Sequence, residues 1–383
     1  MRYPRQPAKK KRRQMMNNKV IIAGGGTGGH IFPAIAIANA LKEKAPGTEI
    51  LFIGAKGKME MEKVPQAGYP VKGLDIAGFN RSSLIKNIGL PFKLVKSYLQ
   101  VRSIMMDFMP DAVIGVGGYS TFPVLRYAQS RGIPTFIHET NSFAGKANKM
   151  LAAKATRIFT ASDGMEKFFP AEKILRTGNP VRKSISTAKI SRAEGVAFFG
   201  LDPAKQTVFA TGGSLGAASI NEAIAQHIDE FDKNNLQLIW QTGQTTAEKY
   251  LPAGNGRKNI WVNGFVTQMD TAYAAADIII SRSGGTIYEL CVVGKPAILV
   301  PYPFAAEDHQ TANAMNLVGH KAALMVKDSD ALHKLLPTLL QLCADRQLQR
   351  ELSSNIAALA ITDADARIAA EIIKTINSKK ENS

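Results

Sequence analysis

Residues 19–44, KVIIAGGGTGGHIFPAIAIANALKEK, set the pattern on which the rest of the chain is built. A short apolar run comes first, then a turn in which five of six residues are glycine, and then an alanine-rich helical pattern. Glycines on a strand-to-helix turn let backbone N–H groups and a helix N-terminus close on an anion. The stretch therefore predicts a phosphate-binding turn that includes Thr27, Gly28 and Gly29, directly before His30.

Short β-branched runs alternate with helical patterns along almost the whole chain. The runs are residues 19–23, 49–54, 111–118, 133–139 and 157–162, and then 206–213, 236–243, 259–265, 276–284 and 296–303. Strands separated by helices predict parallel sheets with helices on both faces. The theme of strand, glycine turn and helix restarts at residues 207–228. We therefore predict an α/β fold of two doubly wound, Rossmann-like domains whose glycine turns face one cleft.

Composition limits the class of protein. The 383 residues are 45% hydrophobic, and Cys291 and Cys343 are too few for a disulfide framework or a cysteine metal cluster. No apolar run reaches the roughly 18 to 20 residues that cross a bilayer, and the basic N-terminus lacks a signal-peptide core, so we expect a cytoplasmic protein. The net charge is +17, with seven positive charges in the first fifteen residues. Residues 1–17 are predicted to form a disordered basic tail, with contact to anionic lipid or RNA as the alternative.

Two familiar phosphate motifs fit the first turn poorly. Gly24, Gly26 and Gly29 satisfy G-x-G-x-x-G, but Ala55 and Lys56 follow the second strand where a dinucleotide site wants an acid. The spacing of a P-loop is also present. His30 and the next residue, an isoleucine, then stand where that motif needs Lys and Ser or Thr, which excludes a P-loop.

Several other polar or glycine-rich loops follow predicted strands. They are VGGYSTFP (116–123), HETNSFAGKAN (138–148), TGGSLGA (211–217), SRSGGTIYE (281–289) and AEDHQTANA (306–314). Each alone reads as readily as a tight turn. Together, and in this order with GGGTGGHIFPAIAIA and GNPVR, they resemble the MurG family of bacterial N-acetylglucosaminyltransferases over roughly residues 19–365. Two positions depart from the family pattern: Thr140 replaces a usual glutamine, and the segment before Glu289 is one residue shorter.

The resemblance implies the two-domain glycosyltransferase fold called GT-B. It implies an N-terminal acceptor and membrane-facing domain (18–182), a C-terminal UDP-GlcNAc-binding domain (183–360) and a last helix (361–383) that returns to the first domain. The implied reaction moves GlcNAc from UDP-GlcNAc to the C4 hydroxyl of MurNAc in lipid I, which forms lipid II in peptidoglycan synthesis. This transfer inverts the sugar linkage and needs a base. His30 is the first candidate, with a phosphate- or turn-holding role as the alternative, and Glu139 is the second.

The resemblance also implies the binding residues. Glu289 is expected to accept both ribose hydroxyls, Val266 to read uracil through its backbone, and Gln310 to bind the sugar. The full donor set is Thr27, Gly28, Gly29, Asn141, Arg182, Gly213, Ser214, Val266, Glu289 and Gln310. The acceptor set is His30, Gly118, Tyr119 and Asn141. We expect no metal and no cofactor, since the Asp-x-Asp matches at 328 and 363 lie outside the glycine turns.

A basic apolar segment suggests where the lipid acceptor is met. No acidic residue lies between Asp75 and Asp107. Contact with anionic lipid is predicted for Phe79, Arg81, Leu84, Ile85, Lys86 and Lys93. The alternative is a surface helix that packs its apolar side on the sheet. We therefore expect a peripheral protein on the cytoplasmic face of the inner membrane, with other cell-wall synthesis and division proteins as further partners.

Two other functions remain open from the sequence. A UDP-GlcNAc 2-epimerase of the same fold would share the nucleotide site but needs no lipid-facing segment. A nucleic-acid-binding protein would suit the basic charge, but the chain lacks aromatic interleaving and any recognisable nucleic-acid module, so nucleic acid is not an expected partner.

Overall fold

The computed structural model describes residues 17–76 and 90–382. The predicted tail up to residue 16 lies outside this range. So do the predicted membrane residues Phe79, Arg81, Leu84, Ile85 and Lys86, and the side chain of Lys93.

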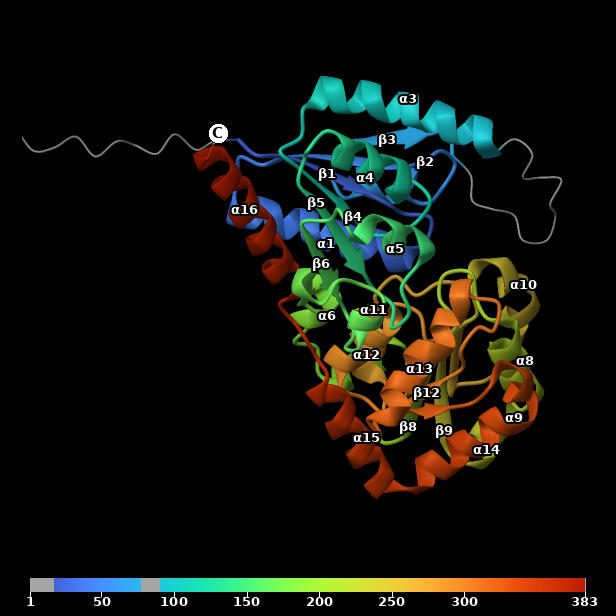
Figure 1. The fold of residues 1–383 in the computed structure, drawn as a ribbon. Coiled ribbons are helices and arrows are strands. Elements are labelled where there is room, and N and C mark those ends of the chain that lie inside the picture. Colours follow the sequence, from blue (N-terminus) through green and yellow to red (C-terminus); the bar gives the residue numbers. More distant parts are fainter. Residues whose placement is uncertain (1–16, 77–89, 383) are drawn as a thin grey trace, which may run out of the picture.

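Two parallel sheets form the centres of two domains (Figure 1). The first sheet has the order β3-β2-β1-β4-β5-β6-β7 and the second the order β10-β9-β8-β11-β12-β13. The first sheet contains β1 (Lys19–Ala23), β2 (Glu49–Ala55), β3 (Val71–Leu74), β4 (Ala112–Gly115), β5 (Thr135–Glu139), β6 (Arg157–Thr160) and β7 (Ile174–Arg176). The second contains β8 (Gln206–Thr211), β9 (Leu236–Gln241), β10 (Ile260–Asn263), β11 (Ile278–Ser281), β12 (Ala297–Leu299) and β13 (Leu324–Met325). The predicted fold class is confirmed.

Helices cover both faces of each sheet. In the first domain they are α1 (Gly28–Lys44), α2 (Glu60–Gln66), α3 (Leu90–Phe108), α4 (Thr121–Ser130) and α5 (Lys146–Ala152). The chain continues with α6 (Lys183–Ser186), α7 (Arg192–Phe198), α8 (Ala218–Gln226), α9 (Asp229–Lys233), α10 (Ala247–Tyr250) and α11 (Met269–Ala275). The remaining helices are α12 (Thr286–Val293), α13 (His309–Gly319), α14 (Ala331–Ala344), α15 (Arg346–Ala358) and α16 (Ala364–Glu381).

Strand β1 shows why the sheets are buried on both faces. Val20 and Ile22 pack in the cluster that includes α1, while Ile21 and Ala23 pack in the cluster on the opposite face. Successive side chains of a strand point to opposite faces, so the four consecutive apolar residues 20–23 need cover on both faces of the sheet. The alternating helices supply that cover.

The last helix lies on the first domain. Ile368, Ile372 and Ile376 recur every four residues on one face of α16 and pack in the same core cluster as α1. Figure 1 shows that α16 lies beside α1, although the two helices stand at opposite ends of the described chain. Lys380 forms an ion pair with Asp111 at 3.0 Å near the end of the helix. The chain thus crosses between the domains twice, before α6 and before α16.

Candidate active site

The first glycine turn, residues 24–29, is packed against the loop that follows β4. The N–H of Gly25 donates to the carbonyl of Gly117 at 3.1 Å. A β-carbon on Gly118, whose φ is +90°, would lie 2.5 Å from the carbonyl oxygen of Gly25. The two loops approach so closely that only glycine fits at these positions. Tyr119, next to Gly118, is 54% exposed.

Behind this turn lies Glu60, a residue that the sequence analysis did not select. Its carboxylate is 2% exposed and accepts the N–H groups of Gly26 and Ala55, both at 2.8 Å. A β-carbon on Gly25 would lie 2.4 Å from the carboxyl carbon. The sequence does carry an acid beyond the second strand, but five residues later than the expected position, at the start of α2. It braces the turn from within.

His30 lies in the first turn of α1. Its Nδ1 lies 3.2 Å from the carbonyl oxygen of Gly25 and 3.3 Å from the hydroxyl of Thr27. A β-carbon on Gly117 would lie 2.6 Å from Nε2, so this glycine leaves the space that the ring occupies. Burial lowers the pKa of His30, and the neighbouring His309 lowers it further. The imidazole is therefore neutral near pH 7.

Glu139 ends β5 and is enclosed by its own loop. The carboxylate, 3% exposed, accepts the N–H of Gly145 at 3.0 Å and the side-chain amide of Asn148 at 2.8 Å. It also accepts the backbone N–H of Asn141 at 3.1 Å and the side-chain amide of the same residue at 3.3 Å. Burial raises the pKa of Glu139, and these hydrogen bonds oppose the rise. With four internal donors the carboxylate holds its own loop, and the catalytic role of Glu139 stays a prediction.

The second glycine turn, residues 212–216, is backed by neutral groups. Gly213 donates its N–H to the hydroxyl of Thr211 at 3.1 Å, and its carbonyl accepts from the amide of Gln241 at 2.9 Å. The other end of the Gln241 amide accepts the N–H of Val266 at 2.9 Å. Ser214 lies half-buried in the turn. The N–H of Val266 is therefore engaged within its own domain, so only the carbonyl of Val266 is left for the predicted contact with uracil.

Glu289 lies in the first turn of α12 and is already paired. Arg182 donates to both carboxylate oxygens, from Nε at 2.9 Å and from Nη2 at 3.0 Å. The hydroxyl of Tyr273, on α11, donates to the same carboxylate at 3.0 Å. The Arg182 guanidinium also lies 5.1 Å from the ring centre of Phe32 in α1. Two predicted donor residues thus meet each other, together with a tyrosine that the sequence did not indicate.

The first glycine turn meets the loop before α12 across the domain interface. A β-carbon on Gly285 would lie 3.5 Å from the Cα of Gly29. Gln310, on α13, accepts the N–H of Tyr302 at 2.9 Å, and its side-chain nitrogen lies 3.7 Å from the β-carbon position of Gly284. The structure therefore brings the start of α1, the start of α12 and the start of α13 to one place.

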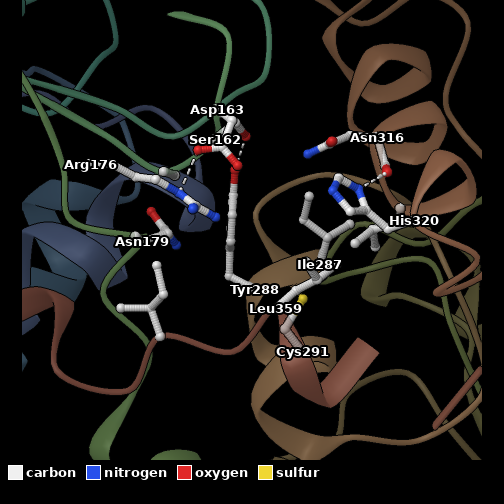
Figure 2. A pocket seen from close by; sticks show the side chains of 14 residues that line it. Ser162, Asp163, Arg176, Asn179, Ile287, Tyr288, Cys291, Asn316, His320 and Leu359 are labelled. Carbon is white, nitrogen blue, oxygen red and sulfur yellow. Dashed lines mark hydrogen bonds and ion pairs between the residues drawn. The ribbon is translucent and has the colours of Figure 1, made fainter. Parts of the chain in front are cut away.

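A small cavity of about 40 Å³ lies between the two domains and is lined by both (Figure 2). Ser162, Arg176 and Asn179 line it from the first domain, and Tyr288 and His320 from the second. In Figure 2 the Tyr288 side chain extends across to Ser162. None of the predicted site residues lines this cavity. Among the described residues, no three His, Cys, Asp or Glu side chains are grouped to hold a metal ion.

Comparison with known proteins gives a consistent result over nearly the whole chain. Residues 20–160 match the family model of the glycosyltransferase family 28 N-terminal domain, and residues 207–368 match that of the family 28 C-terminal domain. A protein of Phocaeicola vulgatus is 50% identical over 361 residues, which cover 93% of this chain and 96% of the relative. A protein of Flavobacterium psychrophilum is 47% identical over 355 residues, 92% of this chain and 96% of the relative.

Both relatives carry the name UDP-N-acetylglucosamine--N-acetylmuramyl-(pentapeptide) pyrophosphoryl-undecaprenol N-acetylglucosamine transferase. Among solved structures, MurG of Acinetobacter baumannii is similar at 30% identity and a TM-score of 0.76, over 93% of this chain and 99% of that one. A UDP-GlcNAc 2-epimerase of Neisseria meningitidis, at 15% identity and a TM-score of 0.65 over 93% and 100% of the two chains, shares the fold.

Proposed function

Because the chain belongs to glycosyltransferase family 28, we propose that it transfers N-acetylglucosamine from UDP-GlcNAc to undecaprenyl-pyrophosphoryl-MurNAc-pentapeptide, lipid I, and so forms lipid II. The observation that carries this proposal is identity of about one half to transferases of that name over more than nine-tenths of the chain. The approach of the first glycine turn to the loop before α12 supports a reaction site between the two domains. The epimerase alternative has no comparable support, since its resemblance extends to the fold alone.

For the chemical step, His30 is the proposed base. Inversion at the sugar requires in-line attack by the acceptor hydroxyl, whose proton must be removed as the bond forms. A neutral imidazole can take that proton, and burial keeps His30 neutral near pH 7. Glu139 enters the proposal as a positioning residue, because its carboxylate already accepts four donors from its own loop.

For the donor, the proposed site runs from the second glycine turn to Glu289. The backbone N–H of Ser214 and the N-terminus of α8 suit the diphosphate, beside Gly213, whose own N–H donates to Thr211. Arg182 would supply positive charge to the leaving group, and Glu289 would accept the ribose hydroxyls with Gln310 near the sugar. We propose that these groups act without a metal ion, and a rate that is unchanged by EDTA is the expected result.

For the membrane, helix α3 is the proposed contact. Val95, Leu99 and Met106 are 63%, 59% and 61% exposed, while Val101 and Met105 face the core. No helix among the described residues is long and apolar enough to span a bilayer. A helix that keeps an apolar stripe in solvent suits peripheral binding at the cytoplasmic face, where a lipid-linked acceptor would be met. Binding to other cell-wall synthesis and division proteins stays a further part of the proposal.

The experiment that tests the function is UDP release from UDP-GlcNAc with and without a soluble lipid I analogue. We expect release only when the acceptor is present, together with a β-linked disaccharide product. Conversion of UDP-GlcNAc to its 2-epimer without an acceptor would contradict the proposal. Changing Val95, Leu99 and Met106 to Ser should reduce sedimentation with anionic vesicles while the rate on the soluble analogue is kept.

A further inference from the structure

Helix α12 carries two neighbouring side chains with different partners. Glu289 pairs with Arg182 and with Tyr273 of the same domain as the helix. Tyr288 reaches into the first domain, where its hydroxyl donates to the backbone carbonyl of Thr140. Contacts with Tyr273 of the second domain and with Thr140 of the first domain therefore start from adjacent residues of a single helix.

The Tyr288 hydroxyl belongs to a chain of hydrogen bonds whose directions can be assigned. A carbonyl only accepts, so the Tyr288 proton goes to Thr140. The Tyr288 oxygen then accepts from the Ser162 hydroxyl at 3.0 Å, and Ser162 accepts from the Ser142 hydroxyl at 2.8 Å. Burial raises the pKa of Tyr288, so the hydroxyl keeps its proton throughout the physiological range.

Asn313, on α13, crosses the interface at the same loop. Its side-chain oxygen accepts the N–H of Ser142 at 2.9 Å. Its nitrogen donates to the carbonyl of Ser283 at 3.0 Å and lies 3.4 Å from the side-chain oxygen of Asn141. Asn313 has no exposed surface. The loop of residues 140–142 is thus held at its backbone by two side chains of the other domain.

We propose that Tyr288 is a positioning residue, which with Asn313 fixes loop 140–142, and thereby Asn141, relative to the helix that carries Glu289. This inference rests on the proposed function, since it concerns that reaction's two substrates. Glu139, in the same domain as loop 140–142, also holds this loop through its hydrogen bonds with Asn141. A shift of α12 should therefore move the loop as a unit. The two positions that depart from the family pattern, Thr140 and the shortened segment before Glu289, meet at this contact.

The test compares two tyrosines that each lose only a hydroxyl. Tyr288→Phe leaves the Thr140 carbonyl without its donor, so kcat at saturating donor should fall about tenfold with the soluble lipid I analogue. Its UDP-GlcNAc Kd should stay within about twofold of the parent protein's. Tyr273→Phe removes the donor to Glu289 and should instead weaken UDP-GlcNAc binding, by about three- to tenfold. Tyr69→Phe is the control, because that hydroxyl donates to Asn39 at 2.7 Å on the surface of the first domain.

A second measurement does not depend on activity. Hydrogen exchange at the Ser142 amide should quicken in Tyr288→Phe and stay unchanged in Tyr69→Phe. The proposal is overturned if Tyr288→Phe keeps its kcat and its Ser142 protection, or if its loss lies in donor affinity as for Tyr273→Phe. Failure of the function itself looks different, since the parent protein would then release no UDP with the acceptor analogue.

Discussion

The two glycine turns look alike in sequence and differ in what stands behind them. The first is braced by the buried carboxylate of Glu60, which accepts the N–H of Gly26. The second is braced by the hydroxyl of Thr211 and the amide of Gln241, which carry no charge. Each turn follows the first strand of its domain and precedes a helix. The same local pattern therefore creates two different electrostatic environments.

This difference separates the expected tasks of the two turns. Each turn has one N–H group engaged, at Gly26 and at Gly213, but the carboxylate behind the first turn also adds negative charge, which disfavours a diphosphate there. The neutral backing of the second turn leaves the positive end of α8 uncompensated, which favours one. The first turn instead presents His30, a group suited to moving a proton. We therefore propose that the first turn serves proton transfer and the second serves anion binding.

The largest effect is expected for His30→Ala, which tests the proton-transfer role of the first turn. If His30 is the base, kcat should fall about 100-fold or more, while the Kd for UDP-GlcNAc changes little. Turnover with the soluble acceptor analogue and donor titration by calorimetry measure the two quantities separately. A near-normal kcat would leave His30 with a turn-holding role, through its contact to Gly25.

The matching change in the second domain is Glu289→Ala. It removes a carboxylate expected to accept ribose hydroxyls, each charge-assisted hydrogen bond contributing about 1.5 to 3 kcal/mol. The loss of one such bond corresponds to about 10- to 150-fold, so donor affinity, measured by calorimetric titration, should fall at least about tenfold. Binding equal to that of the parent protein would remove Glu289 from the ribose site and leave it as the partner of Arg182.

The fold and the positions of the loops could be predicted from the sequence because they depend on local pattern. Apolar runs bounded by glycine turns identify parallel strands, and in such folds the turns gather at the carboxyl ends. The sequence could not show that Glu60 turns back under the first glycine turn, since this depends on the space that Gly25 and Gly54 leave. Nor could it show that Glu139 is enclosed by its own loop.

The sequence also could not show the hydrogen bonds between the two domains. Tyr288 and Asn313 lie inside two of the motifs, SRSGGTIYE and AEDHQTANA, whose patterns point to Glu289 and Gln310. A tyrosine before an acid on a helix carries no signal for a partner almost 150 residues earlier. Only the closure of the two domains, which depends on many side chains together, brings Tyr288 to Thr140.

A change behind the first turn should act on stability. Glu60→Gln keeps the shape of the side chain, but its NH₂ group then faces either Gly26 or Ala55, which both donate. A buried donor left without an acceptor costs about 1 to 3 kcal/mol, so the free energy of unfolding in urea should fall by that amount. Glu222→Gln, an exposed carboxylate beside Lys249, is the control and should show no comparable loss. Equal losses in the two variants would mean that the hydrogen bonds of Glu60 to Gly26 and Ala55 contribute no more to stability than an exposed ion pair.

The smallest expected effect is a pH dependence that separates the two turns. The base must be neutral to act, and burial lowers the pKa of His30 below its ordinary value of 6.5. At pH 6.5 more than half of the imidazole is therefore neutral, so kcat/KM should keep more than half of its plateau and fall only at lower pH.

The Thr211 and Gln241 groups behind the second turn do not titrate in this range, so UDP-GlcNAc affinity should stay level between pH 7.5 and 6.5 as that acid limb begins. An acid limb centred above pH 6.5 would contradict a buried, neutral His30. A donor Kd that rises together with the loss of kcat/KM would instead place the titrating group at the donor site, and the division of tasks between the turns would fail.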